Sequence, residues 1–120
     1  MKGRDVAANL RANVNRWTQY LYYKEGHGTE PQYCVIGLKL MEMGVKVENL
    51  AIQEEMLSLV VDRYELGMDY EDVRTLVMLQ QLNDGARSAN ELASLLETTH
   101  NDVDFPLEKL AEAFKAKGGR

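Results

Sequence analysis

The sequence predicts an all-α fold, a compact single-domain bundle of about six helices. Apolar residues recur at spacings of three and four, and hardly any segment alternates apolar and polar residues as a strand does. The two prolines and nine glycines gather between the periodic segments. With 120 residues, 45% of them apolar, the chain can bury one core over residues 1–120, and residues 115–120 are expected to fray.

A first helix is predicted over about residues 4–23, because five apolar residues recur along it at helical spacing. These residues are Val6, Leu10, Val14, Trp17 and Leu21. Trp17 is therefore expected in the core. Residues 25–32, EGHGTEPQ, then interrupt the pattern with two glycines and a proline. Since this segment is longer than a simple connector needs to be, it is the best candidate for a functional loop.

Two further helices are predicted before the middle of the chain. The first of them, YCVIGLKLMEM, contains Gly37 in its interior and is closed by Gly44. A glycine inside a helix costs about 1 kcal/mol relative to alanine, so Gly37 is expected to permit the close approach of another element. The next helix, about residues 47–66, is apolar nearly all the way round and should be central, ending at Gly67.

Asp69 can cap the fourth helix, YEDVRTLVMLQQL, whose acidic first turn suits the positive end of the helix dipole. Its wide apolar face indicates deep packing. Asn83, Asp84 and Gly85 follow as turn formers and are expected to link this helix to the fifth.

Capping signals also mark the last two helices. Ser88 and Glu91 form an S-x-x-E capping box, which makes the start of the fifth helix the most secure boundary in the chain. Pro106 can occupy the first turn of the sixth helix. The inward faces are Ala89, Leu92, Ala93 and Leu96 in the fifth helix, and Leu107, Leu110, Ala111 and Phe114 in the sixth.

Charge and composition restrict the partners that the chain can have. A formal charge of −5 disfavours non-specific attraction to nucleic acid or anionic lipid, whereas a basic partner protein is easier to accommodate. The single cysteine, Cys34, cannot form an internal disulfide, and the first residues lack the apolar core of a signal peptide. No segment approaches the roughly 20 apolar residues that span a bilayer. A cytoplasmic protein without a membrane partner is expected.

Residues 76–114 resemble the tri-helical core of winged helix-turn-helix repressors, in which a helix with Glu-Leu-Ala precedes a reading helix. A reading helix needs cations and amides toward phosphates and base edges. The polar positions here are Asn101, Asp102, Asp104, Glu108 and Lys109. Three of these five carry carboxylates that repel DNA, so nucleic acid is not the expected partner. The alternative is a transcriptional regulator whose positive charge comes from Arg4, Arg11 and Arg16.

A second resemblance covers more of the chain, about residues 17–97. Its pattern is Trp17, then Tyr33-Cys34 with Gly37, then Leu82-Asn83-Asp84 before Ser88 and Glu-Leu-Ala. It resembles a group of small phage and prophage proteins with the pattern W…YCxxG…LNDxGxSxxE[IL]A. The chain differs from that pattern at Val35, where a second cysteine is frequent. The resemblance implies a viral or mobile-element origin and a role in binding and blocking a host factor.

Catalytic and metal-binding chemistry is not expected. A cysteine inside a helix is usually a small buried apolar residue, and the only histidines that could activate Cys34 are His27, in the preceding loop, and His100, far along the chain. A metal site needs three or four converging ligands, but His27 and Glu30 lie in one loop and His100, Asp102 and Asp104 in another. The second loop has the wrong length and no glycine for a calcium site. We therefore predict a protein that is not an enzyme and has no cofactor.

Tyrosines mark the expected contact surface. Tyr20, Tyr22 and Tyr23 end the predicted first helix, and three adjacent rings cannot all point inward, so at least one should face solvent or a partner. Exposed tyrosines beside a glycine-rich loop suit a binding hot spot. The prediction is a module that binds protein, with homo-oligomer formation left open. Its candidate contact residues are Tyr20, Tyr22, Tyr23, His27, Tyr33, Asn83 and Asp84, the last two also explained as a helix-linking turn.

Overall fold

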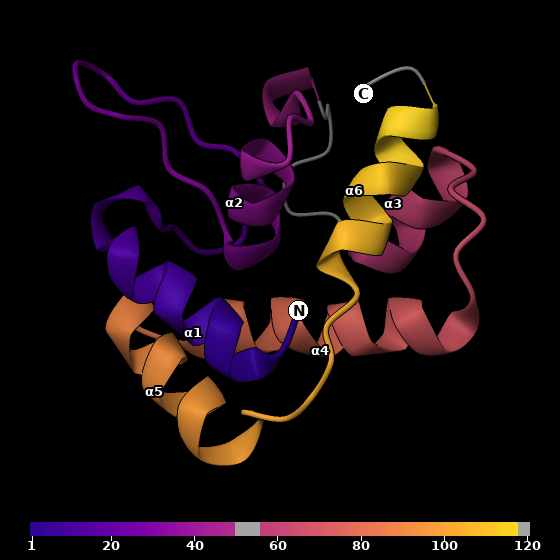
Figure 1. Ribbon diagram of the computed structural model, residues 1–120. Helices are drawn as coiled ribbons and strands as arrows, with labels where there is room; N and C mark the ends of the chain where they lie inside the picture. The colour runs from indigo at the N-terminus through magenta and orange to yellow at the C-terminus, as the bar shows by residue number, and fades with distance from the viewer. Residues whose placement is uncertain (50–55, 118–120) are drawn as a thin grey trace.

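The longest helix, α4, organises the other helices around it. The computed structural model describes residues 1–49 and 56–117. Its helices are α1 (Gly3–Ala12), α2 (Val35–Glu42), α3 (Leu57–Arg63), α4 (Tyr70–Gly85), α5 (Ala89–Thr99) and α6 (Leu107–Ala116), with 3₁₀ turns at Val14–Arg16 and Val47–Asn49. α2 and α3 pack against α4, and α6 packs against α2. α1 and α5 lie along each other beside the C-terminal end of α4 (Figure 1).

Across the described residues there are six α-helices and no sheet, so the predicted fold class is confirmed. All six helices contribute buried side chains to one core. Fully buried examples, one from each helix in chain order, are Leu10, Leu38, Leu57, Leu76, Leu92 and Phe114. The radius of gyration of 13.2 Å is close to the value of about 14 Å that a compact domain of this length has.

Side-chain caps begin the two helices for which they were predicted. The Asp69 carboxylate accepts a hydrogen bond from the Asp72 backbone N–H at 3.0 Å at the start of α4. The Ser88 hydroxyl accepts from the Glu91 N–H at 3.1 Å at the start of α5. The Glu91 carboxylate reaches the N–H of Arg87, one residue before the cap, at 3.4 Å. Each cap satisfies an N–H group that the helix itself leaves unpaired.

The last two helices bury the faces that the sequence predicts. All eight residues assigned to the inward faces of α5 and α6 are buried. Pro106 lies at the N-cap of α6, one position before the first turn in which it was expected. Of the predicted frayed tail, residues 118–120 lie outside the described residues.

The first helix is much shorter than the predicted range of residues 4–23, because α1 ends at Ala12. The Asn13 side chain donates to the Asn9 carbonyl oxygen at 2.8 Å, and the Asn13 backbone leaves the helical region with a φ of −131°. Asparagine favours helix ends because its side chain competes for backbone hydrogen bonds. Tyr20 has a φ of 68°, in the left-handed region, so no α-helix continues through it.

The third helix is also shorter than predicted. Within the expected range of residues 47–66, Val47–Asn49 form a 3₁₀ turn, residues 50–55 lie outside the described residues, and α3 ends at Arg63. Leu59 is 53% exposed, so α3 buries one side only and is not the central helix that was expected. The central place belongs to α4.

α4 extends beyond its predicted end through Gly85, so Asn83 and Asp84 belong to its last turn and not to a linking turn. Its buried side chains are Leu76, Leu79, Gln80 and Asn83, at positions i, i+3, i+4 and i+7. The buried face of α4 therefore begins with the leucines Leu76 and Leu79 and ends with the amide side chains of Gln80 and Asn83.

Gly37 permits the close approach that the sequence predicts. It lies in α2 against the backbone of Tyr22, and a Cβ atom at position 37 would collide with the Tyr22 carbonyl oxygen. A backbone atom cannot move aside as the end of a flexible side chain can. Gly44, at a φ of +89°, follows α2 in the left-handed conformation that suits a glycine after a helix.

We expect Gly37→Ala to lower the free energy of unfolding by about 1–3 kcal/mol, because the added methyl group forces two backbone segments apart. The matched control is Gly85→Ala, since nothing lies within 4 Å of a Cβ atom there. That substitution should be neutral or stabilising. Urea denaturation of the two variants checks the pair, and equal effects would contradict the proposed contact.

Candidate functional site

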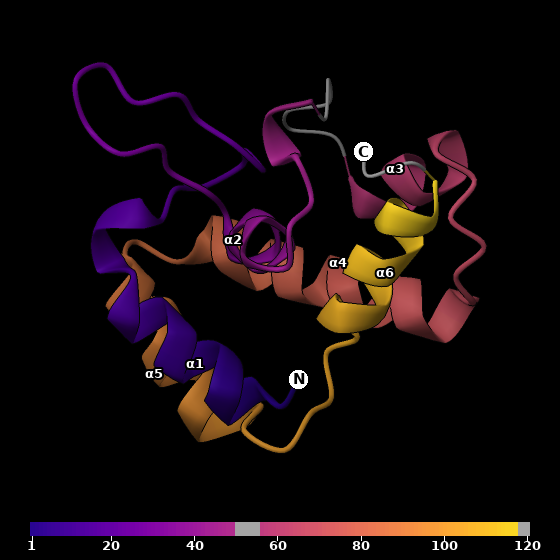
Figure 2. The ribbon, with the colours of Figure 1, turned by 45° about the horizontal axis from the view of Figure 1, so that its top comes forward.

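Residues 17–34 form a projecting loop between α1 and α2 that extends away from the helices (Figures 1 and 2). Its two arms are joined near the base, where the Thr18 N–H donates to the Tyr33 carbonyl oxygen at 2.9 Å. Farther out, Lys24 and Gln32 exchange two backbone hydrogen bonds of 2.8 and 2.9 Å. The loop is therefore closed by backbone pairing, although it forms no strand.

Asn83 attaches the base of the projecting loop to the end of α4. Its side-chain oxygen accepts from the Trp17 indole N–H at 2.6 Å and from the Val35 backbone N–H at 2.9 Å. Its side-chain nitrogen donates to the Thr18 carbonyl oxygen and to the Asp84 carboxylate, both at 3.2 Å. An amide has two donors and two acceptor positions, so this completely buried side chain is fully paired.

Asp84 holds the next residues of the loop. Its carboxylate accepts from the Tyr20 backbone N–H at 2.8 Å, where Tyr20 has its left-handed conformation. The Gln19 side chain also donates to the carbonyl oxygens of Asp84 and Ala86 just beyond the helix. A left-handed non-glycine residue persists only where its surroundings fix it, and these contacts supply that constraint.

A second buried amide, Gln80, connects the loop to α3. It donates to the Tyr22 hydroxyl at 2.9 Å and accepts from the Leu57 backbone N–H at 3.0 Å. Leu57 is the first residue of α3, so its N–H has no partner within its own helix. Gln80 and Asn83 therefore join three separate parts of the chain to α4.

Tyr33 and Cys34 complete the base of the loop. The Tyr33 ring packs edge-on against Tyr23 at 5.7 Å between centroids, and the Arg16 guanidinium lies 5.7 Å from its centre. The Cys34 sulfur accepts from the Gly37 N–H at 3.4 Å and so caps α2. Burial raises the pKa of the Cys34 thiol to about 12. The thiol is therefore protonated at neutral pH, which disfavours its use as a nucleophile.

The structure separates the predicted contact residues into two groups. Tyr20 and His27 are exposed, and Tyr23 and Asp84 are partly exposed. The other three, Tyr22, Tyr33 and Asn83, are buried and cannot touch a partner while the loop keeps this structure. The pattern of Trp17, Tyr33-Cys34, Gly37 and Asn83-Asp84 thus describes how the loop is attached.

The arginines required by the DNA-binding alternative are engaged elsewhere. Arg4 pairs with Asp102 at 2.8 Å, and Arg11 pairs with Glu97 at 2.6 Å, while Arg16 lies over an aromatic ring. α6 packs against α2 and lies well away from α5, so the two helices do not form the packed pair of a helix-turn-helix (Figure 1). No observation favours a nucleic-acid interface here.

Among residues 1–49 and 56–117, no group of three histidine, cysteine, aspartate or glutamate side chains could hold a metal ion. Within the same ranges, every helix is too short or too polar to cross a bilayer.

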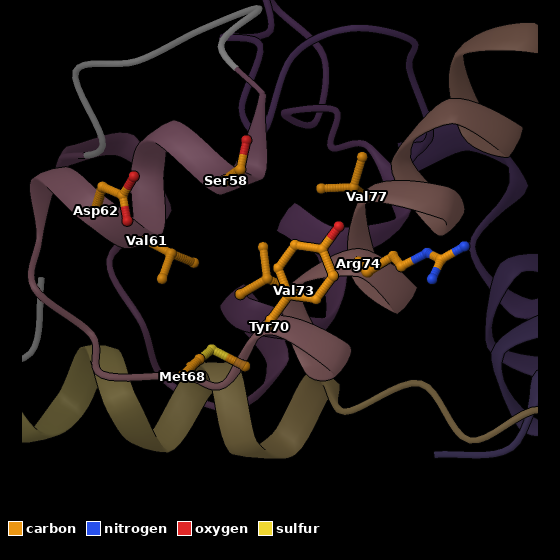
Figure 3. A pocket seen from close by; sticks show the side chains of 8 residues that line it. All are labelled: Ser58, Val61, Asp62, Met68, Tyr70, Val73, Arg74 and Val77. Carbon is orange, nitrogen blue, oxygen red and sulfur yellow. The ribbon is translucent and has the colours of Figure 1, made fainter.

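A cleft between α3 and α4 was missed by sequence reasoning. It has a volume of about 580 Å³ and is lined from both helices and the segment between them (Figure 3). The lining residues are Ser58, Val61, Asp62, Met68, Tyr70, Val73, Arg74 and Val77. The α4 members lie at i, i+3, i+4 and i+7, so α4 has a second stripe besides its buried one. That spacing, beginning with Tyr70, was the signal in the sequence.

We expect Asn83→Ala to lower the free energy of unfolding by about 2–4 kcal/mol, because the Trp17 indole and the Val35 N–H would lose their buried acceptor. Urea denaturation followed by the fluorescence of Trp17 measures the effect. Asp84→Asn is the matched control, since it retains an acceptor for the Tyr20 N–H and should cost much less. Similar losses in the two variants would contradict the central role of Asn83.

The buried Cys34 thiol should make stability depend on pH in the alkaline range. Its pKa is raised in the folded chain, so between pH about 9 and 11 the unfolded chain loses this proton and the folded chain keeps it. The free energy of unfolding should fall with a slope approaching about 1.4 kcal/mol per pH unit from this group. The difference between the parent chain and Cys34→Ser, measured by urea denaturation, isolates the effect. A constant difference across this range would contradict it.

Within the part of the chain that the structure describes, the projecting loop and the α3–α4 cleft are accessible features on which a function can be based. No family model matches this chain, and neither a curated protein nor a solved structure matches it.

Proposed function

We propose that this domain works by binding another protein through the exposed part of the projecting loop. The observation that carries the proposal is the contrast between the base and the surface of the loop. The base is fixed by the buried Asn83, whereas Tyr20 is 54% exposed and His27 is also exposed. Loops held by a rigid scaffold commonly carry binding residues, and a tyrosine fixed in one conformation loses little entropy on binding.

The charge of the loop favours a polypeptide partner with a basic surface. Glu25 and Glu30 are exposed near the tip, and the whole chain has a formal charge of −5. Such a surface attracts cations and repels phosphate groups. The resemblance to small phage and prophage proteins further favours a host protein as the partner, met in the host cytoplasm and modulated or inhibited by binding.

Affinity capture with the full chain tests the proposal. In one variant, residues 25–30 are replaced by glycine and serine at equal length, and in another Tyr20 is replaced by alanine. We expect both variants to keep the helical circular dichroism spectrum and to bind the captured partner about tenfold more weakly or worse.

The matched control is Leu59→Ala, which removes a side chain of similar exposure, 53%, from α3 and not from the loop. It should retain the partner at full strength. A partner captured equally well by the loop variants would show that the loop is not the contact surface.

A further inference from the structure

The α3–α4 cleft is lined by α3 and the first half of α4, which lie at the opposite end of the molecule from the projecting loop (Figures 1 and 2). The proposed function does not use this cleft. We propose that this cleft is the interface through which two copies of the chain form a two-fold dimer. The inference goes beyond the proposed function and does not depend on it.

The apolar part of the surface is suited to reciprocal packing. Tyr70 is 76% exposed, and its ring lies at the cleft that Val61, Met68 and Val73 also line (Figure 3). An aromatic ring left this exposed beside an apolar depression is typical of an interaction surface. In a two-fold dimer each Tyr70 ring can pack into the cleft of the other copy. One ring and one cleft on each chain are then enough to form both halves of the interface.

The charges at the cleft select a second copy as the occupant. Asp62 lies on one side of the Tyr70 ring and Arg74 on the other (Figure 3). Both side chains are exposed, and neither has an ion-pair partner within residues 1–49 and 56–117. A two-fold axis that lies in the interface between Asp62 and Arg74, beside the Tyr70 ring, brings Asp62 of each copy toward Arg74 of the other, which gives two equivalent ion pairs.

This arrangement is self-complementary, whereas a surface with charges of one sign would repel its own copy. Specific pairs are needed because the net charge of −5 on each chain opposes association. An apolar small molecule would have no need of opposite charges on the two sides of the ring. The dimer leaves both projecting loops accessible, since they lie at the far ends of the two chains.

Sedimentation equilibrium of the full chain tests the interface. We expect the mass to rise with concentration toward twice the 13.6 kDa of one chain. Asp62→Arg and Arg74→Asp should each weaken dimer formation at least about tenfold, because each places two like-charged pairs across the axis. Tyr70→Ala should weaken it as well. Glu25→Arg, a charge reversal on the loop, is the matched control and should leave the dimer intact.

Mixing the two charge variants gives the decisive measurement. Asp62→Arg and Arg74→Asp chains should form heterodimers with each other, since both pairs are then attractive, and the double variant should recover the homodimer. Circular dichroism establishes that each variant is folded. A parent chain that stays monomeric at all concentrations overturns the proposal, even where the cleft binds a small apolar molecule or another protein. A dimer that survives both single reversals, or variants that fail to pair when mixed, also overturns it.

Discussion

The buried amide of Asn83 is the interaction on which the rest of the structure depends. Three of its four hydrogen bonds join the last turn of α4 to Trp17, to the Thr18 backbone in the projecting loop and to the start of α2, and the fourth is to Asp84 in the same turn. The bond from the Val35 N–H is buried, whereas the bonds that involve Trp17 and Thr18 are partly buried. Because an unpaired buried polar group is costly, a course of the loop that leaves the Asn83 amide unpaired is disfavoured.

α4 serves two separate surfaces. One stripe is buried and ends in the amides of Gln80 and Asn83, which connect α3 and the loop to the core. The other begins at Tyr70 and lines an open cleft with α3. On this second stripe Tyr70 and Arg74 are exposed, whereas Val73 and Val77 are partly buried against the core. The two proposed interaction surfaces depend on this one helix, since it anchors the loop at one end and supplies the cleft at the other.

Sequence signals for helix caps and for close backbone approach predicted the structure correctly. Asp69 and Ser88 cap the helices that they were predicted to cap, and Gly37 lies where another segment passes closely. Periodicity was misleading over residues 4–23, because the spacing of apolar residues there fits a helix that Asn13 ends early. Of the candidate contact residues, Tyr20 and His27 are exposed, whereas Tyr22 is buried and its hydroxyl bonds to Gln80 from 58 residues away.

The sequence by itself determined the all-α class, the starts of α4 and α5 and the inward faces of the last two helices, because caps and spacing act over a few residues. Only the tertiary structure decided the course of residues 17–34, the burial of Tyr33 and the opening of the cleft between α3 and α4. These features depend on contacts between segments far apart in the chain, such as the bond from Trp17 to Asn83, and no local pattern specifies which distant group will satisfy a given donor.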